Sequence, residues 1–551
     1  MLKSSDRVNP PSDSCLLQDH TRLRTFTSIT CDQLATLSKK IVAKSCLLDP
    51  IPAQVLKECF NSLLPTITKM VNISLQSAVV PQSLKVASLQ PRLKKASLDP
   101  DEFNSFRPIS NLKFISKSIE KVVADQTCQY VKNNNLEELY QSAYKTSHST
   151  ETALLKVQND ILRALDNKNS VILLLLDLSA AFDTIDHEIL LSRLSGRFGI
   201  VDKALEWFRS YLTNRTFTVN VSGSKSSTHT LRSGVPQGSV LGPILFSLYI
   251  SPLGDLIKRH GMNYHLYADD TQLYITFKSS DNSECDAAIA KIETCIREVD
   301  DWMTWNKLKL NGNKTELLVL TARNRLQPSL DSILVCDEVI RPSSLVKNLG
   351  ILFDSSLDME QYVTNVCKSG FYHLRNISRI RKHLTQQNAE TLIHAFISSR
   401  LDFCNSLLYG LPKYLIDRIQ SVQNAAARIV SLTRRCDHIT PILFNLHWLP
   451  VQDRIVFKVL LITYKALYGM APQYIADLIN KYIPKCNLRS STSNQLEVQH
   501  YNLNFYGHRA FSCAAPILWN SLPDNLRHCD SLLSFKRQLK TYLFHKTFID
   551  I

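Results

Sequence analysis

The sequence predicts a mixed α+β fold, and three patterns support this class. An apolar run at 171–176 has the length of a buried strand, and apolar residues with helical spacing follow at 186–194. Apolar and polar residues alternate in the second half of 263–277, as in a strand with one buried face. At 281–305 apolar residues recur at intervals of three and four, which predicts an amphipathic helix that covers the sheet.

These elements belong to regions that follow a flexible lead at 1–30, which is rich in Ser, Pro and Asp. Helical patterns predict an N-terminal extension at 31–74, in which a helix begins at Ala53 after the turn-rich stretch DPIP. Strand and helix patterns alternate over 75–356. From 357 to 551 the patterns are helical and carry several basic clusters.

A hairpin and two short strands complete the predicted sheet. We expect a β-hairpin within 263–277, with residues 268–270 at its tip. Strand-like runs recur at 308–310 and at 316–320. Residues 81–108 carry five cations among prolines and small apolar residues, which indicates an extended basic surface.

The composition excludes several classes of protein. The chain has 551 residues, of which 44% are hydrophobic and 21% charged, so a disordered, collagen-like or coiled-coil chain is excluded. No apolar stretch approaches the roughly 18 to 20 residues of a membrane-spanning helix, so we expect a soluble protein. The N-terminus lacks the apolar region of a secretory signal, which makes cytoplasm and nucleus the expected location.

The net charge indicates a kind of partner, and the cysteine spacing excludes two kinds of site. The 64 Lys and Arg residues exceed the 49 Asp and Glu residues by 15, which weakly favours a polyanionic partner such as a nucleic acid. The 14 cysteines include no pair closer than Cys285 and Cys295, so neither a zinc knuckle nor a redox dithiol is predicted. We expect the cysteines to be reduced and mostly buried.

Three aspartates occupy positions where a carboxylate is costly. Asp177 ends the apolar run, and Asp269 and Asp270 are adjacent at the expected hairpin tip. Carboxylates brought together in partly buried surroundings repel each other unless a cation joins them, and oxygen ligands suit Mg²⁺. Taken alone, each position is more simply explained as a solvated turn or a strand-end cap. Only their combination favours a metal site.

Between the acidic segments, residues 233–253 form a glycine-containing loop followed by an apolar run. Gly234, Gly238 and Gly242 would allow the backbone to approach a ligand closely, and the run after them has the apolar density of a packed helix. A loop that leads into a helix beside paired carboxylates is a candidate nucleotide platform. Glycines needed only for turn geometry are an equal alternative.

Six motifs occur in a fixed order along the chain. The acidic motifs are LLLLDLSAAFDTIDH and YADD, and the loop motif between them is SGVPQGSVLGP. FRPISNL at 106–112, NGNKTE at 311–316 and NLGILFD at 348–354 complete the order. From about Asp49 onward, the chain resembles the reverse transcriptases of non-LTR (LINE-type) retrotransposons, most closely the Jockey-like branch. This resemblance implies a right-hand polymerase with fingers, a palm on an antiparallel βαββ-type sheet, and a helical thumb.

The resemblance implies roles at matching positions. Asp177 and Asp269 would hold two Mg²⁺ or Mn²⁺ ions, with Asp270 completing the acidic cluster. Phe182 would lie against the sugar of the incoming nucleotide and exclude a 2′-hydroxyl, although core packing explains an aromatic residue there as well. Gln237, beside Gly238, would contact the incoming nucleotide and the template.

The resemblance also implies roles for several basic residues and for one turn. Arg107 would grip triphosphate oxygens, and Lys314 matches a position from which a lysine could protonate the pyrophosphate leaving group. Lys94 or Lys95 would also reach phosphate, with a solvated face an equal alternative. Residues 349–350 would lie in the turn that supports the primer end.

The implied activity is extension of a DNA 3′ end with deoxynucleoside triphosphates (dNTPs), on an RNA template with a DNA primer. The segment before Asp49 is too short for the family's usual endonuclease, so we expect this chain to lack that domain. Two explanations stay open: a truncated copy of an element, or one product whose endonuclease is a separate partner. Two alternatives stay open. One is a catalytically silent, element-derived nucleic-acid-binding protein, and the other is an RNA-synthesising polymerase, against which the bulk of Phe182 argues.

Overall fold

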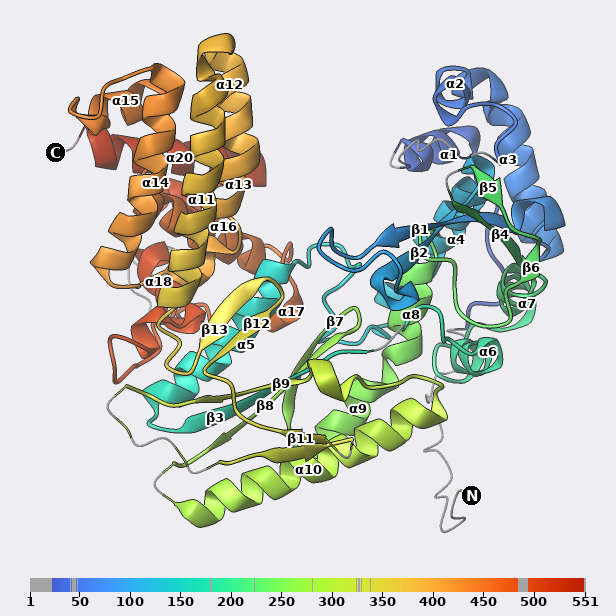
Figure 1. The fold of residues 1–551 in the computed structure, drawn as a ribbon, viewed down its shortest axis with the longest axis horizontal. Helices are drawn as coiled ribbons and strands as arrows, with labels where there is room; N and C mark the ends of the chain where they lie inside the picture. The colour runs from blue at the N-terminus through green and yellow to red at the C-terminus, as the bar shows by residue number, and fades with distance from the viewer. Residues whose placement is uncertain are drawn as a thin grey trace. The chain divides into compact units, whose positions relative to one another are not determined.

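The structure, a computed structural model, describes residues 22–549 except for a few short stretches, which are 40, 42–45, 47, 179–180, 222, 280, 324, 326–327, 329, 337 and 484–493. Helices and strands alternate in a mixed α+β arrangement, which confirms the predicted class (Figure 1). The chain divides into two compact units, each described below by itself. Throughout the described ranges, every helix is too short or too polar to cross a bilayer.

Unit 1 contains the described residues up to Tyr144 together with Asp177–Gly261 and Cys295–Asn311. Its five-stranded sheet has the order β2-β1-β4-β5, with β6 also paired to β4. Strand β1 is antiparallel to β2 and parallel to β4. The strands are β1 (Val86–Leu93), β2 (Phe106–Asn111), β4 (Thr216–Val221), β5 (Ser224–Lys225) and β6 (His229–Thr230). The helices are α1 (Cys31–Ser38), α2 (Ala53–Glu58), α3 (Phe60–Ser77), α4 (Phe114–Asn133), α6 (His187–Gly196), α7 (Asp202–Leu212), α8 (Gly242–Ile250) and α9 (Pro252–Arg259).

Unit 2 contains Lys145–Leu176, Met262–Thr294 and the described residues from Gly312 onward. Its main sheet has the order β7-β8-β3-β9, and every pairing in it is antiparallel. These strands are β3 (Ser170–Leu176), β7 (Asn263–Tyr267), β8 (Asp270–Phe277) and β9 (Glu316–Leu320). Two separate hairpins follow, β10 (Ile333–Val335) with β11 (Glu338–Ile340), and β12 (Leu345–Asn348) with β13 (Ile351–Asp354). Helix α10 (Asn282–Trp305) has residues in both units.

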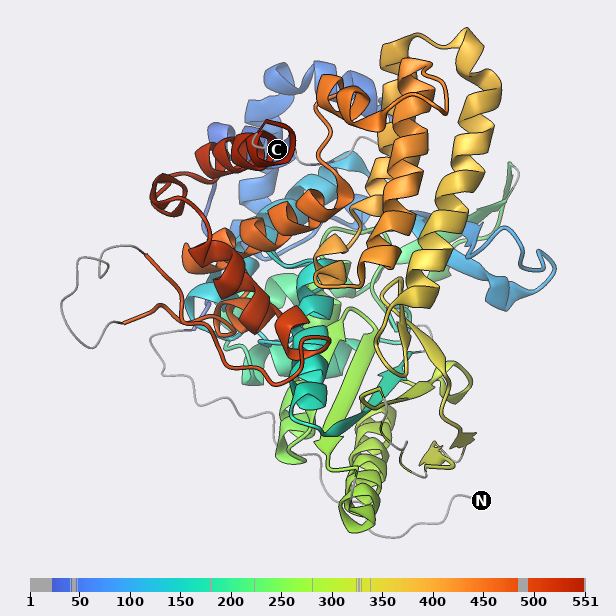
Figure 2. The same ribbon diagram turned by 90° about the vertical axis from the view of Figure 1, so that its left-hand side faces the viewer.

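Beyond Leu357 the regular elements of the described chain are helices, as predicted. Helices α11, α12 and α14 lie side by side in both views (Figure 1 and Figure 2). The helices of unit 2 are α5 (Thr150–Asp166), α11 (Glu360–Ile380), α12 (Gln386–Ile393), α13 (Ser399–Leu401), α14 (Lys413–Ser431), α15 (Ile439–Asn445), α16 (Val451–Leu467), α17 (Gln473–Ala476), α18 (Phe511–Asn520), α19 (Asp524–Arg527) and α20 (Leu532–Phe548).

Most sequence-predicted elements are confirmed. The run at 171–176 lies in β3, the amphipathic segment 281–305 is α10, and 316–320 is β9. The strand predicted at 308–310 is wrong. Leu310 makes an isolated antiparallel bridge with Leu178, and in the described chain a single bridge is not continued into a ladder of paired residues.

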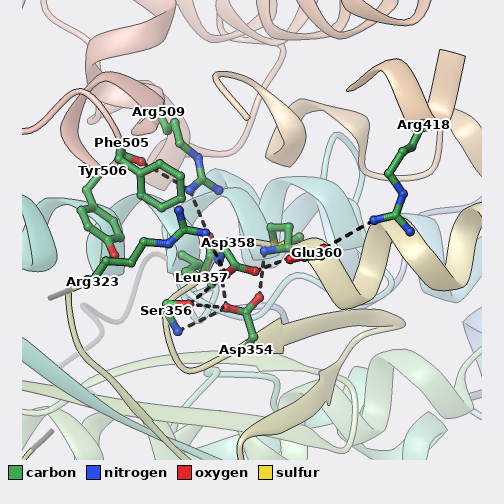
Figure 3. A network of polar contacts seen from close by, with 11 residues as sticks. Arg323, Asp354, Ser356, Leu357, Asp358, Glu360, Arg418, Phe505, Tyr506 and Arg509 are labelled. Atoms are coloured by element: carbon green, nitrogen blue, oxygen red, sulfur yellow. Dashed lines mark hydrogen bonds and ion pairs between the residues drawn. The ribbon is translucent and has the colours of Figure 1, made fainter. Parts of the chain in front are cut away.

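A polar network in unit 2 joins the end of β13 to the C-terminal region (Figure 3). Asp354 accepts hydrogen bonds from the amides of Asp358 and Met359, at 2.9 and 2.8 Å. Arg323 donates to Asp358 at 2.9 Å. The buried Arg509 donates to the carbonyl oxygen of Leu357 at 3.0 Å. Segments far apart in the sequence are therefore tied to the loop that follows the β12–β13 hairpin.

Unit 1 holds residues 233–241, which we call the PQG loop, against two other segments. The Gly234 amide donates to the carbonyl of Ile185 at 2.7 Å, and the Ser110 amide in β2 donates to the carbonyl of Gln237 at 2.7 Å. Gly238 has φ +116°, and a Cβ there would lie 2.7 Å from the carbonyl oxygen of Ser110. Glycine is therefore required for this approach of the loop to β2.

Gly238→Ala should lower the free energy of unfolding by about 2 kcal/mol or more, because it combines backbone strain with a clash against Ser110. Gly223→Ala is the matched control, since Gly223 has φ +88° but nothing within 4 Å of the added Cβ. Denaturant titration of both variants measures the difference. Equal losses would contradict the close approach of loop and strand.

His265 is a fully buried histidine in β7 of unit 2. Its ring meets Tyr474 edge to face, with the ring centroids 4.9 Å apart. Burial, together with the positive charges of Lys156, His148 and Lys145, lowers the pKa of His265 to about 3. The folded protein therefore keeps this imidazole neutral at pH values where the unfolded chain protonates it.

We expect the free energy of unfolding to fall as the pH drops below the ordinary histidine pKa of 6.5, because the unfolded chain then binds a proton that the folded chain does not. One such proton contributes up to about 1.4 kcal/mol per pH unit. Denaturant titrations between about pH 7 and about pH 5 measure the slope. His265→Gln should reduce that slope, and an unchanged slope in this variant would contradict the assignment.

Candidate active site

Asp269 and Asp270 lie at the tip of the β7–β8 hairpin in unit 2, as the sequence predicted. Tyr267 pairs with Asp270, so Ala268 and Asp269 form a two-residue turn. Ala268 has φ +56°, a left-handed conformation that is uncommon for residues other than glycine. Both aspartates are half-buried.

Asp177 follows β3 directly in the chain and is half-buried. Leu176, the last residue of β3, pairs with Thr271, which is the residue after Asp270 in β8. Within unit 1, the carbonyl oxygen of Asp177 accepts a hydrogen bond from the Asn311 amide at 2.9 Å. Asp177 therefore directly follows β3 in the chain, and β3 pairs with β8, the strand that begins at Asp270.

The three aspartates offer only carboxylate oxygens, the ligand type that Mg²⁺ and Mn²⁺ prefer. The donor chemistry therefore fits the implied ions. In the described part of the chain, no group of three or more His, Cys, Asp or Glu residues is arranged to hold a metal ion. The metal-binding role of Asp177, Asp269 and Asp270 stays a prediction.

Gln237 lines a cavity of about 190 Å³ in unit 1. Its side-chain oxygen Oε1 is buried and accepts no hydrogen bond from the described residues. The other polar residues that line the cavity are Ser110, Asp183, Arg215 and Thr216. Burial raises the pKa of Asp183, and the positive charge of Lys94 opposes this shift. Gln237 therefore combines a place on the cavity wall with a buried acceptor that has no partner among the described residues.

Phe182 lies beside the PQG loop in unit 1. Its carbonyl accepts a hydrogen bond from the Val235 amide at 2.9 Å. Its half-buried ring stacks on Phe246 of α8, with the centroids 4.8 Å apart. The Phe182 ring thus packs against another aromatic ring, as the core-packing explanation expects. Its role in sugar selection stays a prediction.

Arg107 lies in β2, the strand that contacts the PQG loop through Ser110. It pairs across the strands with Arg92 of β1, and both residues are exposed. Lys95 is exposed in the connection between β1 and β2, where Lys94 donates to the carbonyl oxygen of Asn104 at 2.8 Å. Unit 1 therefore brings together Phe182, Gln237, Gly238 and the strand that carries Arg107.

Lys314 and the turn at 349–350 lie in unit 2. Lys314 is exposed in a short 3-10 turn, Gly312–Lys314, just before β9. Leu349 and Gly350 connect β12 to β13, and both have positive φ, +44° and +94°. Two positive φ values in a two-residue connection produce a tight hairpin turn. The predicted turn is confirmed, and the support of a primer end stays a prediction.

Sequence reasoning missed Glu120, a buried carboxylate that contacts the PQG loop. It also missed Arg193, a buried cation that donates to the carbonyl oxygen of Tyr249 in α8 and to Asn306 at 2.7 Å. A charged residue among apolar neighbours is the signal that could have found both. Glu120 follows Ile119 and precedes Val122 and Val123, and all three of these neighbours are buried.

Comparison with known proteins identifies the matched family. Residues 93–353 match the model of the reverse transcriptase (RNA-dependent DNA polymerase) family. This range contains the segments of Phe182, Gln237, Asp269 and Asp270. The match thus covers the segments that sequence reasoning selected for chemistry.

Several curated proteins are similar over more than half of this chain. The probable RNA-directed DNA polymerase from transposon X-element of Drosophila melanogaster is 28% identical over 347 residues, which is 59% of this chain and 36% of that protein. The RNA-directed DNA polymerase from mobile element jockey of the same species is 28% identical over 354 residues, which is 62% of this chain and 37% of that protein. The chain therefore spans little more than a third of the length of these relatives.

Among solved structures, apo telomerase from Candida tropicalis, truncated of its C-terminal domain, has a TM-score of 0.36 and 13% identity, covering 57% of this chain and 62% of that chain. A likeness this low supports no argument about the fold. The sequence matches do support the resemblance drawn from the six motifs. Residues 93–353 therefore match the reverse transcriptase domain family, and the chain is similar to the RNA-directed DNA polymerases from the jockey and X-element mobile elements.

Proposed function

We propose that this domain extends a DNA 3′ end on an RNA template by two-metal phosphoryl transfer from dNTPs, as in retrotransposition. The observation that carries the proposal is the register of β3 and β8. The last paired residues are Leu176 of β3 and Thr271 of β8. Asp177, from the first acidic motif, directly follows Leu176 in the chain, and Asp270, from the second acidic motif, directly precedes Thr271. The register itself follows from backbone pairing and does not depend on the family resemblance.

Asp177 and Asp269 hold the two metal ions in this proposal, and Asp270 completes the acidic cluster. Their half-buried carboxylates favour cation binding, because negative charges in partly desolvated surroundings are stabilised by a bound cation. Bound Mg²⁺ or Mn²⁺ would lower the pKa of a 3′-hydroxyl and stabilise the charge on pyrophosphate. The protein's own contribution is to hold the reacting groups in line.

The PQG loop and Phe182 select the nucleotide in this proposal. Gln237 lines a cavity and has a side-chain oxygen without a partner in the described chain, which supports a contact with the incoming nucleotide and the template base. Gly238 lets the loop approach β2 closely. The ring of Phe182 is braced by Phe246 and would collide with a 2′-hydroxyl, so deoxynucleotides are preferred.

Basic residues of the β1–β2 hairpin hold phosphate oxygens in this proposal. Like charges directly opposite each other on adjacent strands destabilise a sheet, and Arg92 faces Arg107 in this way. A bound triphosphate or template phosphate would offset the repulsion, as a guanidinium suits bidentate contacts with phosphate. Lys95 adds a third cation in the same hairpin. Lys314 serves as the general acid toward pyrophosphate.

An exposed face of α11 supports the proposed binding of an RNA template paired with a DNA primer. Lys368, Tyr372, Arg375 and Arg379 are exposed and spaced by three or four residues, which places them on one side of the helix. Cations there would neutralise phosphates, and the exposed ring of Tyr372 would contact a sugar or base.

Asp177→Ala and Asp269→Ala should each lower primer extension by more than about 100-fold, because each removes a proposed direct metal ligand. Binding to an RNA–DNA duplex should persist, since the basic surfaces are unchanged. Asp301→Ala, at an exposed position on α10, is the control and should extend normally. Extension by either active-site variant at the wild-type rate would contradict the proposal. A wild-type protein that binds RNA but never extends a primer would favour the silent nucleic-acid-binding alternative.

Phe182→Val should raise the ratio of ribonucleotide to deoxynucleotide incorporation on the order of 10- to 100-fold, because the smaller side chain leaves room for a 2′-hydroxyl. Single-nucleotide extension with matched dNTP and rNTP measures this ratio. Loss of the stacking with Phe246 lowers the amount of active enzyme equally for both substrates, so it leaves the ratio unchanged. An unaltered ratio would remove the proposed role of the ring.

A further inference from the structure

We propose that Glu120 is a positioning residue for the polymerase, one that sets the PQG loop and thereby the nucleotide contact of Gln237. Glu120 lies in α4, more than a hundred residues before the loop in the chain. The inference rests on the function proposed above and deepens it, because it names what holds the nucleotide platform in place.

The contacts of Glu120 converge on the end of the loop. Its Oε2 accepts hydrogen bonds from the amides of Val240 and Leu241, at 2.7 and 3.2 Å. Its Oε1 accepts a weaker one from the hydroxyl of Ser116 at 3.3 Å. The residue is 1% exposed. Two backbone donors at the start of α8, which have no partner within that helix, are thus satisfied by one buried carboxylate.

A buried cation accompanies this carboxylate. Arg215 is 1% exposed, and its guanidinium carbon lies 4.6 Å from the centre of the Tyr211 ring. Burial raises the pKa of Glu120, while the charge of Arg215 and the two loop amides oppose this shift. One guanidinium nitrogen of Arg215, Nη2, is buried without a hydrogen-bond partner in the described chain.

Arg215 connects the carboxylate to the nucleotide platform, because it lines the same cavity as Gln237. The loop is therefore held on both sides of its functional segment. Backbone contact with Ser110 fixes Gln237, and Glu120 fixes the residues three and four positions later. Loss of Glu120 would release one anchor and leave the charge of Arg215 unbalanced at the cavity wall.

Asp166 offers a matched control in unit 2. It is also a fully buried carboxylate, and it accepts hydrogen bonds from two backbone amides, those of Asn502 and Leu503, at 2.9 and 2.6 Å. A cation, Arg163, lies 3.3 Å from its other oxygen. Asp166 thus repeats the chemistry of Glu120 at a loop that the proposal does not connect with nucleotide binding.

The test compares Glu120→Ala and Glu120→Gln with Asp166→Ala and Asp166→Asn in steady-state primer extension. Glu120→Ala should raise the KM for dNTP by about 10-fold, because two charge-assisted hydrogen bonds to the loop are lost. Glu120→Gln should raise it less, since the amide oxygen still accepts from the loop. The Asp166 variants should reduce the amount of active enzyme without changing this KM.

Two outcomes would overturn the proposal. One is a wild-type KM for dNTP in both Glu120 variants, which would make the residue merely structural. The other is unchanged hydrogen exchange at the amides of Val240 and Leu241 in Glu120→Gln and Glu120→Ala. Hydrogen exchange needs no catalysis, so it tests the anchor separately from the proposed function. A wild-type protein that extends no primer would overturn the proposed function. Faster exchange at these amides in the Glu120 variants would still support the anchor.

Discussion

The pairing of β3 with strands on both sides is the constraint on which the rest of unit 2 depends. Residues Val171–Leu174 are fully buried, and β3 bonds to β8 on one side and to β9 on the other. Because consecutive residues of β3 are buried, both of its faces lie in the core, and backbone pairing with β8 and β9 holds the strand in one register. In that register Leu176 and Thr271 form the last pair of β3 with β8, so Asp177 and Asp270 are the residues next to this pair in the chain. Hydrophobic burial thus positions the chain segments that carry the proposed metal ligands.

Buried carboxylates organise both units in the same way. Glu120 and Asp166 each accept two backbone amides from a segment distant in sequence, and each has an arginine nearby. A buried charge is costly unless it is paired and hydrogen-bonded, so each carboxylate requires its loop to adopt one conformation. Charge satisfaction therefore specifies loop geometry where apolar packing alone would leave it variable. In unit 1 the loop specified in this way is the one that carries Gln237.

The network around Asp354 extends this logic to the C-terminal region. Arg323 and Arg509 both lie near the ring of Phe505, 4.3 and 5.0 Å from its centre, and both reach the segment that follows β13. Burial of Arg509 lowers its pKa to about 10, although the nearby Asp354, Tyr506 and Asp358 favour its charged form. The C-terminal segment thus packs as part of unit 2. It stabilises the loop after the hairpin whose turn is proposed to support the primer.

The sequence by itself determined the elements whose patterns are local. The apolar run of β3, the alternation in β8 and the spacing in α10 each reflect one buried face, and the ordered motifs were sufficient to indicate the reverse transcriptase family. Only the tertiary structure decided which distant groups meet. The anchor from Glu120 to Val240, the stacking of Phe182 on Phe246, and the failure of 308–310 to form a strand all depend on partners from other parts of the chain. Periodicity reports which face of an element is buried, but a hydrogen bond or a ladder partner exists only after folding has brought the two segments together.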